Sequence, residues 1–183
     1  RTELLQNIVD CDVLVPTYDY PIDAETIAAA KQLKLIANFG VGFNNIDLEA
    51  AKNRGIIVTN TPAPVIDPTA EQTFTLMLAC AHRTAELDRK MRQTNDIEIG
   101  VMNNLGISIC GKTLGIIGMG RIGQAVATRA VACGMSIIYH NRHKLSDETE
   151  QKCHARYVSR EELLQTADFV VLLLPYTPET HHL

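Results

Sequence analysis

The stretch Thr113-Leu114-Gly115-Ile116-Ile117-Gly118-Met119-Gly120-Arg121-Ile122-Gly123 decides the fold of this chain. An apolar run leads into three glycines, Gly118, Gly120 and Gly123, and then into an alanine-rich segment. This order predicts a strand, a tight turn and a helix. The first glycine permits the bend, the second lets a pyrophosphate approach the backbone, and the third lets helix and strand pack closely. The N–H groups at the helix start would then hold the phosphates.

A second strand at Ser136-Ile137-Ile138-Tyr139 follows the predicted helix and completes a βαβ unit of about 30 residues. Three glycines at this spacing are weak evidence by themselves, and a glycine turn in some other α/β protein is the alternative. The strand before the glycines and the helix after them are the context that favours dinucleotide binding.

Composition narrows the class of protein. The chain has 183 residues, of which 46% are hydrophobic and 21% charged, so one large or two small domains with a real core are expected. The net charge of −4 argues against nucleic acid as a partner. No run is apolar enough to span a bilayer, and no signal peptide opens the chain. Five scattered cysteines without a C-x-x-C pair argue against a zinc site or a disulfide framework and indicate a cytoplasmic protein.

Strand and helix patterns alternate along the chain, which predicts parallel sheets of the α/β class. The expected strands are 12–15, 33–37, 56–59, 113–117, 136–139, 156–158 and 169–174. The expected helices are 23–32, 47–54, 69–91, 124–131, 146–154 and 159–166, the last opened by a capping box at Ser159. Residues 93–110 lose periodicity, so we place a junction there, between a domain at 1–100 and a domain at 101–183.

Five segments together resemble the D-isomer-specific 2-hydroxyacid dehydrogenases, particularly the glyoxylate/hydroxypyruvate reductase branch. They are Val41-Gly42-Phe43-Asn44-Asn45-Ile46-Asp47, Asn60-Thr61-Pro62, Pro68-Thr69-Ala70-Glu71, Gly111–Gly123 and Leu174-Pro175-Tyr176-Thr177-Pro178-Glu179-Thr180. The resemblance implies two doubly wound parallel-sheet domains, a flavodoxin-like substrate domain and a Rossmann NAD(P)-binding domain, both incomplete here, with the active site in the cleft between them. It also implies a homodimer and hydride transfer between a nicotinamide and a small 2-oxo acid.

No residue of this chain is assigned a catalytic role. In the family, the Arg that grips the substrate, the acidic residue that tunes the His, and the proton-exchanging His match positions beyond residue 183. Two other functions stay open: a dinucleotide-sensing protein similar to the transcriptional corepressors of this fold, and a dehydrogenase of formate or phosphite. No metal site is expected.

The resemblance assigns binding roles residue by residue. The backbone N–H groups of Val41 and Gly42 would hold the substrate carboxylate; the alternative is a strand-to-helix turn that needs glycine for its geometry. Asn45 and Asp47 are expected to cap and brace the next helix. The cofactor-binding positions are Thr69, Gly118, Met119, Gly120, Arg121, Ile122, Gly123, Asn141, Arg142, His143, Pro175 and Thr180. Thr69 would lie near the nicotinamide, although a hydroxyl that satisfies a helix N-terminus is equally compatible.

The end of the second cofactor strand departs from the pattern of an NAD enzyme. Such enzymes carry Asp or Glu there to bind the adenine ribose hydroxyls, whereas this chain has Asn141, followed by Arg142, His143 and Lys144. A neutral amide does not repel a 2′-phosphate, and the basic residues can bind it. We therefore expect NADP(H) as the preferred cofactor, with NAD(H) also accepted. The alternative is a solvated basic turn without a role in discrimination.

Overall fold

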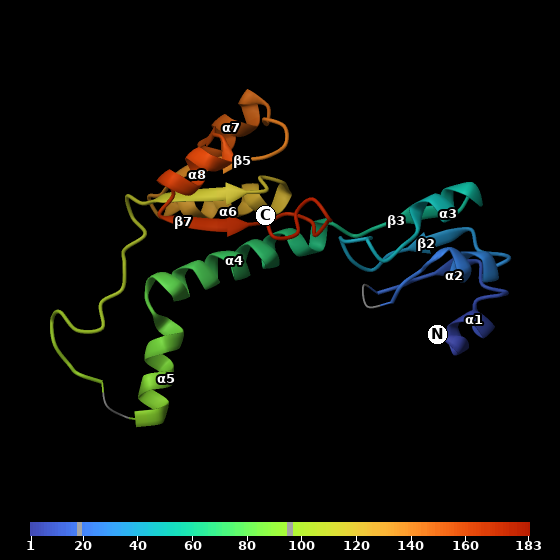
Figure 1. Cartoon of the computed structure of the whole chain (residues 1–183), viewed down its shortest axis with the longest axis horizontal. Helices are drawn as coiled ribbons and strands as arrows, with labels where there is room; N and C mark the ends of the chain where they lie inside the picture. Colours follow the sequence, from blue (N-terminus) through green and yellow to red (C-terminus); the bar gives the residue numbers. More distant parts are fainter. Residues whose placement is uncertain (18–19, 95–96) are drawn as a thin grey trace. The chain divides into compact units, whose positions relative to one another are not determined.

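The computed structural model describes residues 1–17, 20–94 and 97–183 and divides into two compact units, Arg1–Val65 and Ile66–Leu183. Each unit contains a parallel sheet with helices (Figure 1), so the predicted α/β class is confirmed. The spatial division falls earlier than the predicted junction because helix α4 (Ile66–Ala81) packs against helix α6 (Arg121–Ala132) of the second unit. The assignment of a substrate domain to 1–100 and a cofactor domain to 101–183 stays a prediction.

The first unit is built on three parallel strands in the order β1-β2-β3. Its strands are β1 (Val13–Leu14), β2 (Leu35–Ala37) and β3 (Ile57–Thr59), and its helices are α1 (Thr2–Asn7), α2 (Ala24–Ala29), α3 (Leu48–Asn53) and the short 3₁₀ helix η1 (Ala63–Val65). Leu35 pairs with Val13 on one side and Ile57 on the other, so β2 is central. The carboxylate of Asp47 accepts the N–H of Ala50 at 2.9 Å, which confirms the predicted cap of α3.

The second unit is built on four parallel strands in the order β6-β5-β4-β7. They are β4 (Thr113–Ile117), β5 (Ser136–His140), β6 (Ala155–Tyr157) and β7 (Phe169–Leu172). Besides α4 and α6, the helices are α5 (Thr84–Thr94), α7 (Asp147–Cys153) and α8 (Arg160–Thr166). Ser159 accepts the N–H of Glu162 at 3.1 Å and so caps α8 as predicted. Of the helices in the described part of the chain, none is long and apolar enough to cross a membrane.

Helices cover both faces of the central strand β4. A Cβ atom on Gly115 would lie 2.6 Å from the Leu163 side chain of α8, whereas the Ile116 side chain lies beside Gly123 of α6. Successive residues of a strand point to opposite faces, so α8 and α6 lie on opposite sides of the sheet. This double cover explains the continuous apolar sequence of β4 and places the glycine turn at its carboxyl end.

The predicted single helix over residues 69–91 is wrong. Helix α4 ends at Ala81 and α5 begins at Thr84, with Arg83 between them at a positive φ of 56°. The break coincides with a contact from a distant segment, because the N–H of Ile107 donates to the carbonyl oxygen of Ala81 at 2.8 Å. The left-handed residue that ends a helix is usually glycine. An arginine in that position gives no local sign of the break.

Candidate functional site: a dinucleotide-binding turn

The turn between β4 and α6 needs two of its three glycines for its own packing. Gly118 has a φ of 102°, and a Cβ atom there would lie 2.5 Å from the carbonyl oxygen of Leu173. A Cβ atom on Gly123 would lie 2.6 Å from the carbonyl oxygen of Gly118. Side chains rarely adopt the first conformation and do not fit in either space. These two glycines therefore set the bend and the close approach of α6 to β4.

Gly120 differs because, apart from its two chain neighbours, no described part of the protein lies within 4 Å of a Cβ atom placed there. Its backbone (φ −79°, ψ −162°) suits any residue, so packing does not explain this glycine. It is the N-cap of α6 and makes no side-chain capping bond. The first-turn N–H groups of Arg121, Ile122 and Gly123 have no acceptor within the helix. An open glycine before an uncapped helix start is suited to a phosphate group.

Asn141 directly follows β5 and is bonded to the glycine turn. Its Oδ1 accepts the N–H of Met119 at 2.7 Å, and the Met119 side chain is fully buried. The Met119 N–H is thus used inside the protein. An aspartate could accept the same bond, but it would add a negative charge at the end of β5. Asn141 braces the turn without that charge, a role that the sequence did not reveal.

Two tyrosines hold the segment that follows β5. The hydroxyl of Tyr157 donates to the Asn141 carbonyl at 3.3 Å, and the hydroxyl of the fully buried Tyr139 accepts the N–H of Leu145 at 2.9 Å. Tyr139 also donates to Glu150 at 2.8 Å. Burial raises the pKa of Tyr139 to about 12, so it stays a neutral donor. Sequence reasoning missed this brace; one aromatic residue in an apolar strand is its only signal.

The three basic residues after Asn141 do not share one environment. Lys144 forms ion pairs with Asp147 at 3.0 Å and Glu150 at 3.2 Å, and these contacts raise its pKa. Arg142 and His143 are exposed. Only Arg142 of the three lines the pocket at the strand ends. The positive charge available to a ligand there is therefore that of Arg142 rather than Lys144.

A pocket of about 350 Å³ lies at the carboxyl ends of β4 and β5. It brings together four of the predicted cofactor residues: Asn141, Arg142, Pro175 and Thr180. Arg160, at the start of α8, also lines this pocket and was not anticipated from the sequence. Open α/β sheets bind ligands at this edge. Glu179 is in the lining as well, and its pKa is lowered by hydrogen bonding with Thr177 and, less strongly, by the charge of Arg142.

The segment after β7 is held in a compact turn by one hydroxyl. Thr180 Oγ1 accepts the N–H of Thr177 at 2.8 Å and lies 2.8 Å from the Pro175 carbonyl, to which it donates. Thr180 thus shapes the wall of the pocket from within. Thr69 is elsewhere on the unit: it lies in the first turn of α4, is half-buried, and is not part of the pocket lining. Its predicted place near the nicotinamide stays a prediction.

The predicted substrate loop follows β2 in the first unit. Val41 and Gly42 lie between two exposed aromatic side chains, Phe39 and Phe43. The expected capping role of Asn45 is wrong: its Nδ2 donates instead to the carbonyl oxygens of Tyr20 at 2.9 Å and Thr17 at 3.3 Å. Asn45 therefore ties the loop region to the segment after β1, a long-range contact that local spacing cannot show.

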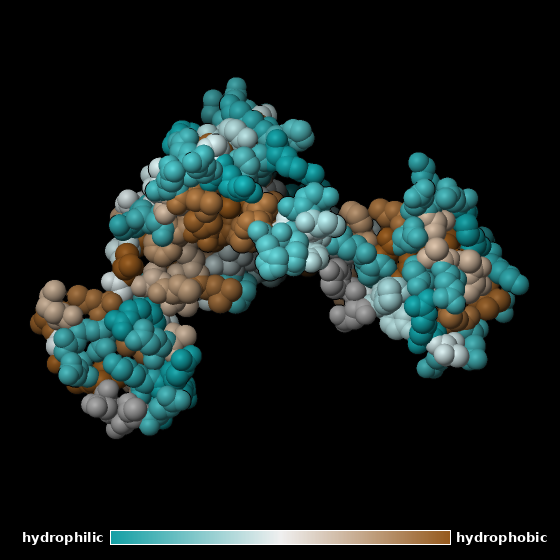
Figure 2. All heavy atoms as spheres, in the orientation of Figure 1, coloured by the Kyte–Doolittle hydropathy of each residue, from teal (hydrophilic) through white to brown (hydrophobic). Residues whose placement is uncertain are grey.

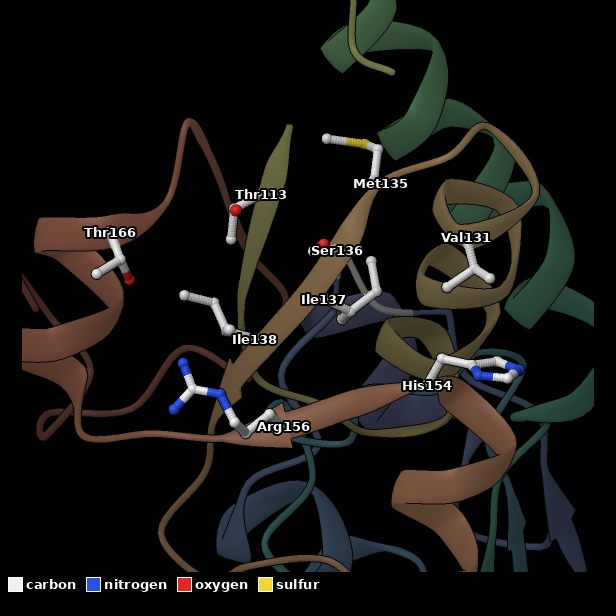
Figure 3. Close-up of a pocket in the computed structure, with 9 residues that line it drawn as sticks. All are labelled: Thr113, Val131, Met135, Ser136, Ile137, Ile138, His154, Arg156 and Thr166. Atoms are coloured by element: carbon white, nitrogen blue, oxygen red, sulfur yellow. The ribbon is translucent and has the colours of Figure 1, made fainter. Parts of the chain in front are cut away.

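A second hollow, of about 490 Å³, lies at the other end of the sheet (Figure 3). It is lined by Thr113 and Ser136, the first residues of β4 and β5. Ile137 and Ile138 also contribute, and they point to opposite faces of β5, so the hollow wraps around the strand starts. None of the predicted binding residues lines it. Within the described ranges, no group of three or more His, Cys, Asp or Glu could hold a metal ion.

The parallel sheet, the glycine turn and the pocket at its carboxyl edge define a dinucleotide-binding α/β protein. The family model described as "D-isomer specific 2-hydroxyacid dehydrogenase, NAD binding domain" matches residues 74–183. This chain belongs to the D-isomer-specific 2-hydroxyacid dehydrogenase family, which confirms the resemblance seen in the motifs.

Two glyoxylate reductases are similar to this chain over nearly its whole length. Glyoxylate reductase from Korarchaeum cryptofilum is 43% identical over 181 residues, covering 98% of this chain and 54% of the relative. The structure of a glyoxylate reductase from Paecilomyes thermophila has a TM-score of 0.87 at 37% identity, covering 100% of this chain and 57% of that one. The chain thus spans about half the length of these relatives.

Two more distant structures were solved with a nicotinamide cofactor. D-lactate dehydrogenase from Aquifex aeolicus, with NAD and lactic acid, is 32% identical with a TM-score of 0.84, covering 97% of this chain and 52% of that one. An acyclic imino acid reductase with NADPH and D-Arg is 27% identical with a TM-score of 0.85, covering 98% and 56%. Similar proteins thus bind either NAD or NADPH.

Proposed function

We propose that this protein is an oxidoreductase that transfers a hydride between NAD(P)H and a small 2-oxo acid of the glyoxylate or hydroxypyruvate type. The observation that carries the proposal is the open Gly120 before the uncapped start of α6, beside a pocket lined by Asn141 and Arg142. Family membership supports the reaction class, and similarity to glyoxylate reductases supports the substrate class. The nicotinamide, when bound, supplies the hydride chemistry, and the protein supplies binding and orientation.

We further propose that NADP(H) is preferred over NAD(H). Asn141 braces the turn as a neutral amide, so no carboxylate opposes a 2′-phosphate at the end of β5. Arg142 lines the adjacent pocket and offers the planar donors that bind phosphate well. His143 is exposed beside it and can donate a further hydrogen bond.

The substrate carboxylate is assigned to the backbone N–H groups of Val41 and Gly42. In the family, a substrate-binding Arg, an acidic residue and a proton-exchanging His complete the active site, and we match none of the three to a residue of this chain. We therefore expect the 183-residue chain alone not to reduce glyoxylate at a normal rate. Rapid turnover by that purified chain would contradict this assignment.

The decisive test uses a full-length protein that carries this chain. We would measure kcat/KM with NADPH and with NADH, each with glyoxylate and with hydroxypyruvate. Turnover with a NADPH:NADH ratio well above one is expected. A ratio below one would refute the phosphate argument while leaving the reaction class intact. Dinucleotide binding without turnover would refute the enzymatic proposal in favour of a dinucleotide sensor.

We propose a homodimer as the working form. The segment at 97–107 exposes large apolar side chains on the second unit, an unusual density for surface in contact with water (Figure 2). The residues are Ile99, Val101, Met102, Leu105 and Ile107. A second copy of the chain is the expected cover. Replacing Val101 by aspartate should then shift sedimentation toward the monomer, and an unchanged dimer would exclude this segment from the interface.

A further inference from the structure

Three consecutive carbonyl groups of the substrate loop are bonded to donors within the first unit. The carbonyl of Gly40 accepts the N–H of Thr61 at 3.0 Å. The carbonyl of Val41 accepts Nδ2 of Asn60 at 3.0 Å, and that of Gly42 accepts Nδ2 of Asn38 at 2.8 Å. The loop is therefore fixed through its oxygen atoms, although it belongs to no helix or strand.

This bonding fixes the direction of the N–H groups. In a trans peptide the C=O and the following N–H point in opposite directions. The Gly40 carbonyl points toward the groups that donate to it, so the Val41 N–H of the same peptide points away from them. In the same way, the Val41 carbonyl points toward Asn60, so the Gly42 N–H points away from Asn60. Within the described part of the chain, the N–H groups of Val41 and Gly42 have no acceptor. Adjacent free N–H groups form a site suited to an anion.

Asn38 is the buried half of this arrangement. It directly follows β2, and its side chain is 1% exposed. Its Nδ2 lies 2.8 Å from the Gly42 carbonyl and 3.3 Å from the Gly40 carbonyl, so both neighbours are acceptors and the orientation of the amide is determined. Its Oδ1 is buried without a partner among the described residues.

Asn60 is the exposed half. It follows β3 at the same edge of the sheet, where it lines a small pocket with Phe43, Leu48 and Val58. Its side-chain amide donates to the Val41 carbonyl. Because its side chain is exposed, its removal leaves no buried group unsatisfied, unlike the removal of Asn38.

We propose that Asn38 and Asn60 are positioning residues that aim the N–H groups of Val41 and Gly42 at the carboxylate of the 2-oxo acid. This inference rests on the proposed function, and it assigns the orientation of the loop to two side chains that do not themselves touch the substrate. When the loop backbone can rotate freely, its N–H groups must be ordered as the carboxylate binds. The entropy lost in that ordering lowers the affinity.

The test is Asn60→Ala in the full-length protein, with Asn53→Ala, an exposed residue at the end of α3, as the matched control. Calorimetry with oxamate, an unreactive carboxylate analogue, at saturating NADPH measures binding without turnover. We expect Asn60→Ala to raise the Kd of oxamate and the KM of glyoxylate about tenfold or more. The reason is that a loop N–H that is no longer aimed at the carboxylate loses a hydrogen bond to a charged group. The KM of NADPH, the melting temperature and the kcat/KM for glycolaldehyde, which lacks the carboxylate, should stay unchanged. The control should bind oxamate normally.

Two results would overturn the inference: unchanged oxamate binding by Asn60→Ala, or an equal loss with glycolaldehyde and glyoxylate, which indicates general damage. Asn38→Ala provides a second variant, with the same carboxylate-specific loss expected at a lower melting temperature. The two proposals fail separately. A parent protein that binds oxamate in an Asn60-dependent way without turnover refutes the enzyme proposal alone, whereas normal turnover with Asn60-independent binding refutes the positioning role alone. A parent that neither binds oxamate nor turns over refutes both.

Discussion

Alanine substitutions at the three glycines of the β4–α6 turn should separate ligand binding from folding. At Gly120 an added methyl group meets no protein atom and the backbone is ordinary, so the fold should accept it. At Gly118 the methyl group would lie 2.5 Å from the Leu173 carbonyl oxygen at a φ of 102°. At Gly123 it would lie 2.6 Å from the Gly118 carbonyl oxygen.

The magnitudes follow from these neighbours. Gly118→Ala combines backbone strain of about 1–3 kcal/mol with overpacking of about 1–3 kcal/mol, a large part of a typical free energy of unfolding of about 5–15 kcal/mol. Gly123→Ala carries the overpacking alone. In Gly120→Ala, alanine is a poorer N-cap residue than glycine, which destabilises the fold. Alanine also reduces the conformational entropy of the unfolded chain, which stabilises the fold by about 0.4–1 kcal/mol, so the free energy of unfolding should change little. Its methyl group instead occupies space that a pyrophosphate needs, and we expect a loss in NADPH affinity of at least tenfold, about 1.4 kcal/mol.

Thermal unfolding and fluorescence titration with NADPH, on the full-length protein and the three variants, check this prediction. Gly120→Ala should melt within a few degrees of the parent without ligand, but at the same NADPH concentration it should gain about 1.4 kcal/mol less stabilisation than the parent. Gly118→Ala should melt lowest even without ligand. If Gly120→Ala bound NADPH as tightly as the parent, the assignment of the open glycine to the pyrophosphate would be refuted. If it unfolded as readily as Gly118→Ala, the packing argument would be refuted instead.

Three further predictions concern single side chains. Asn141→Asp should keep the bond to Met119 but lower the NADPH:NADH ratio of kcat/KM about 10–100-fold, and an unchanged ratio would contradict the charge argument. Burial raises the pKa of Tyr139 to about 12, so the folded state resists its ionisation. The free energy of unfolding should therefore fall as pH rises from about 10 toward 12, and chemical unfolding should show a smaller fall in Tyr139→Phe. The backbone hydrogen bond from Thr26 lowers the pKa of Asp23 to about 2, so stability should fall as pH drops from about 4 to 2, with a smaller slope in Asp23→Asn.

Local pattern predicted most of the fold because the deciding signals are local. An apolar run before spaced glycines and an alanine-rich helix predicted the β4–α6 unit, and the alternation of strands and helices predicted both parallel sheets. The break at Arg83 escaped prediction because the contact that accompanies it, the bond between Ile107 and Ala81, joins segments far apart in sequence.

The candidate site was predictable in its residue types more than in its contacts. Asn141 was singled out as a missing carboxylate, but its bond to Met119 depends on how two strands end side by side. Lys144 was grouped with Arg142 by adjacency, whereas its ion pairs with Asp147 and Glu150 come from the helix that follows. The bonds of Asn38 to its loop needed the three-dimensional course of the backbone.

Among the described residues, strand β7 is an edge strand of its sheet, and its Val170 and Leu172 side chains are exposed. In this topology, β5 pairs with one side of β4, β6 pairs with β5, and β7 pairs with the other side of β4. Each strand can therefore join the sheet without breaking a strand pair that has already formed. On a ribosome, β4, β5 and β6 can assemble before β7 emerges, and β7 then joins the free side of β4. Because an unpaired strand edge offers free N–H and C=O groups to another chain, the β7 edge is where two partly folded chains would pair first.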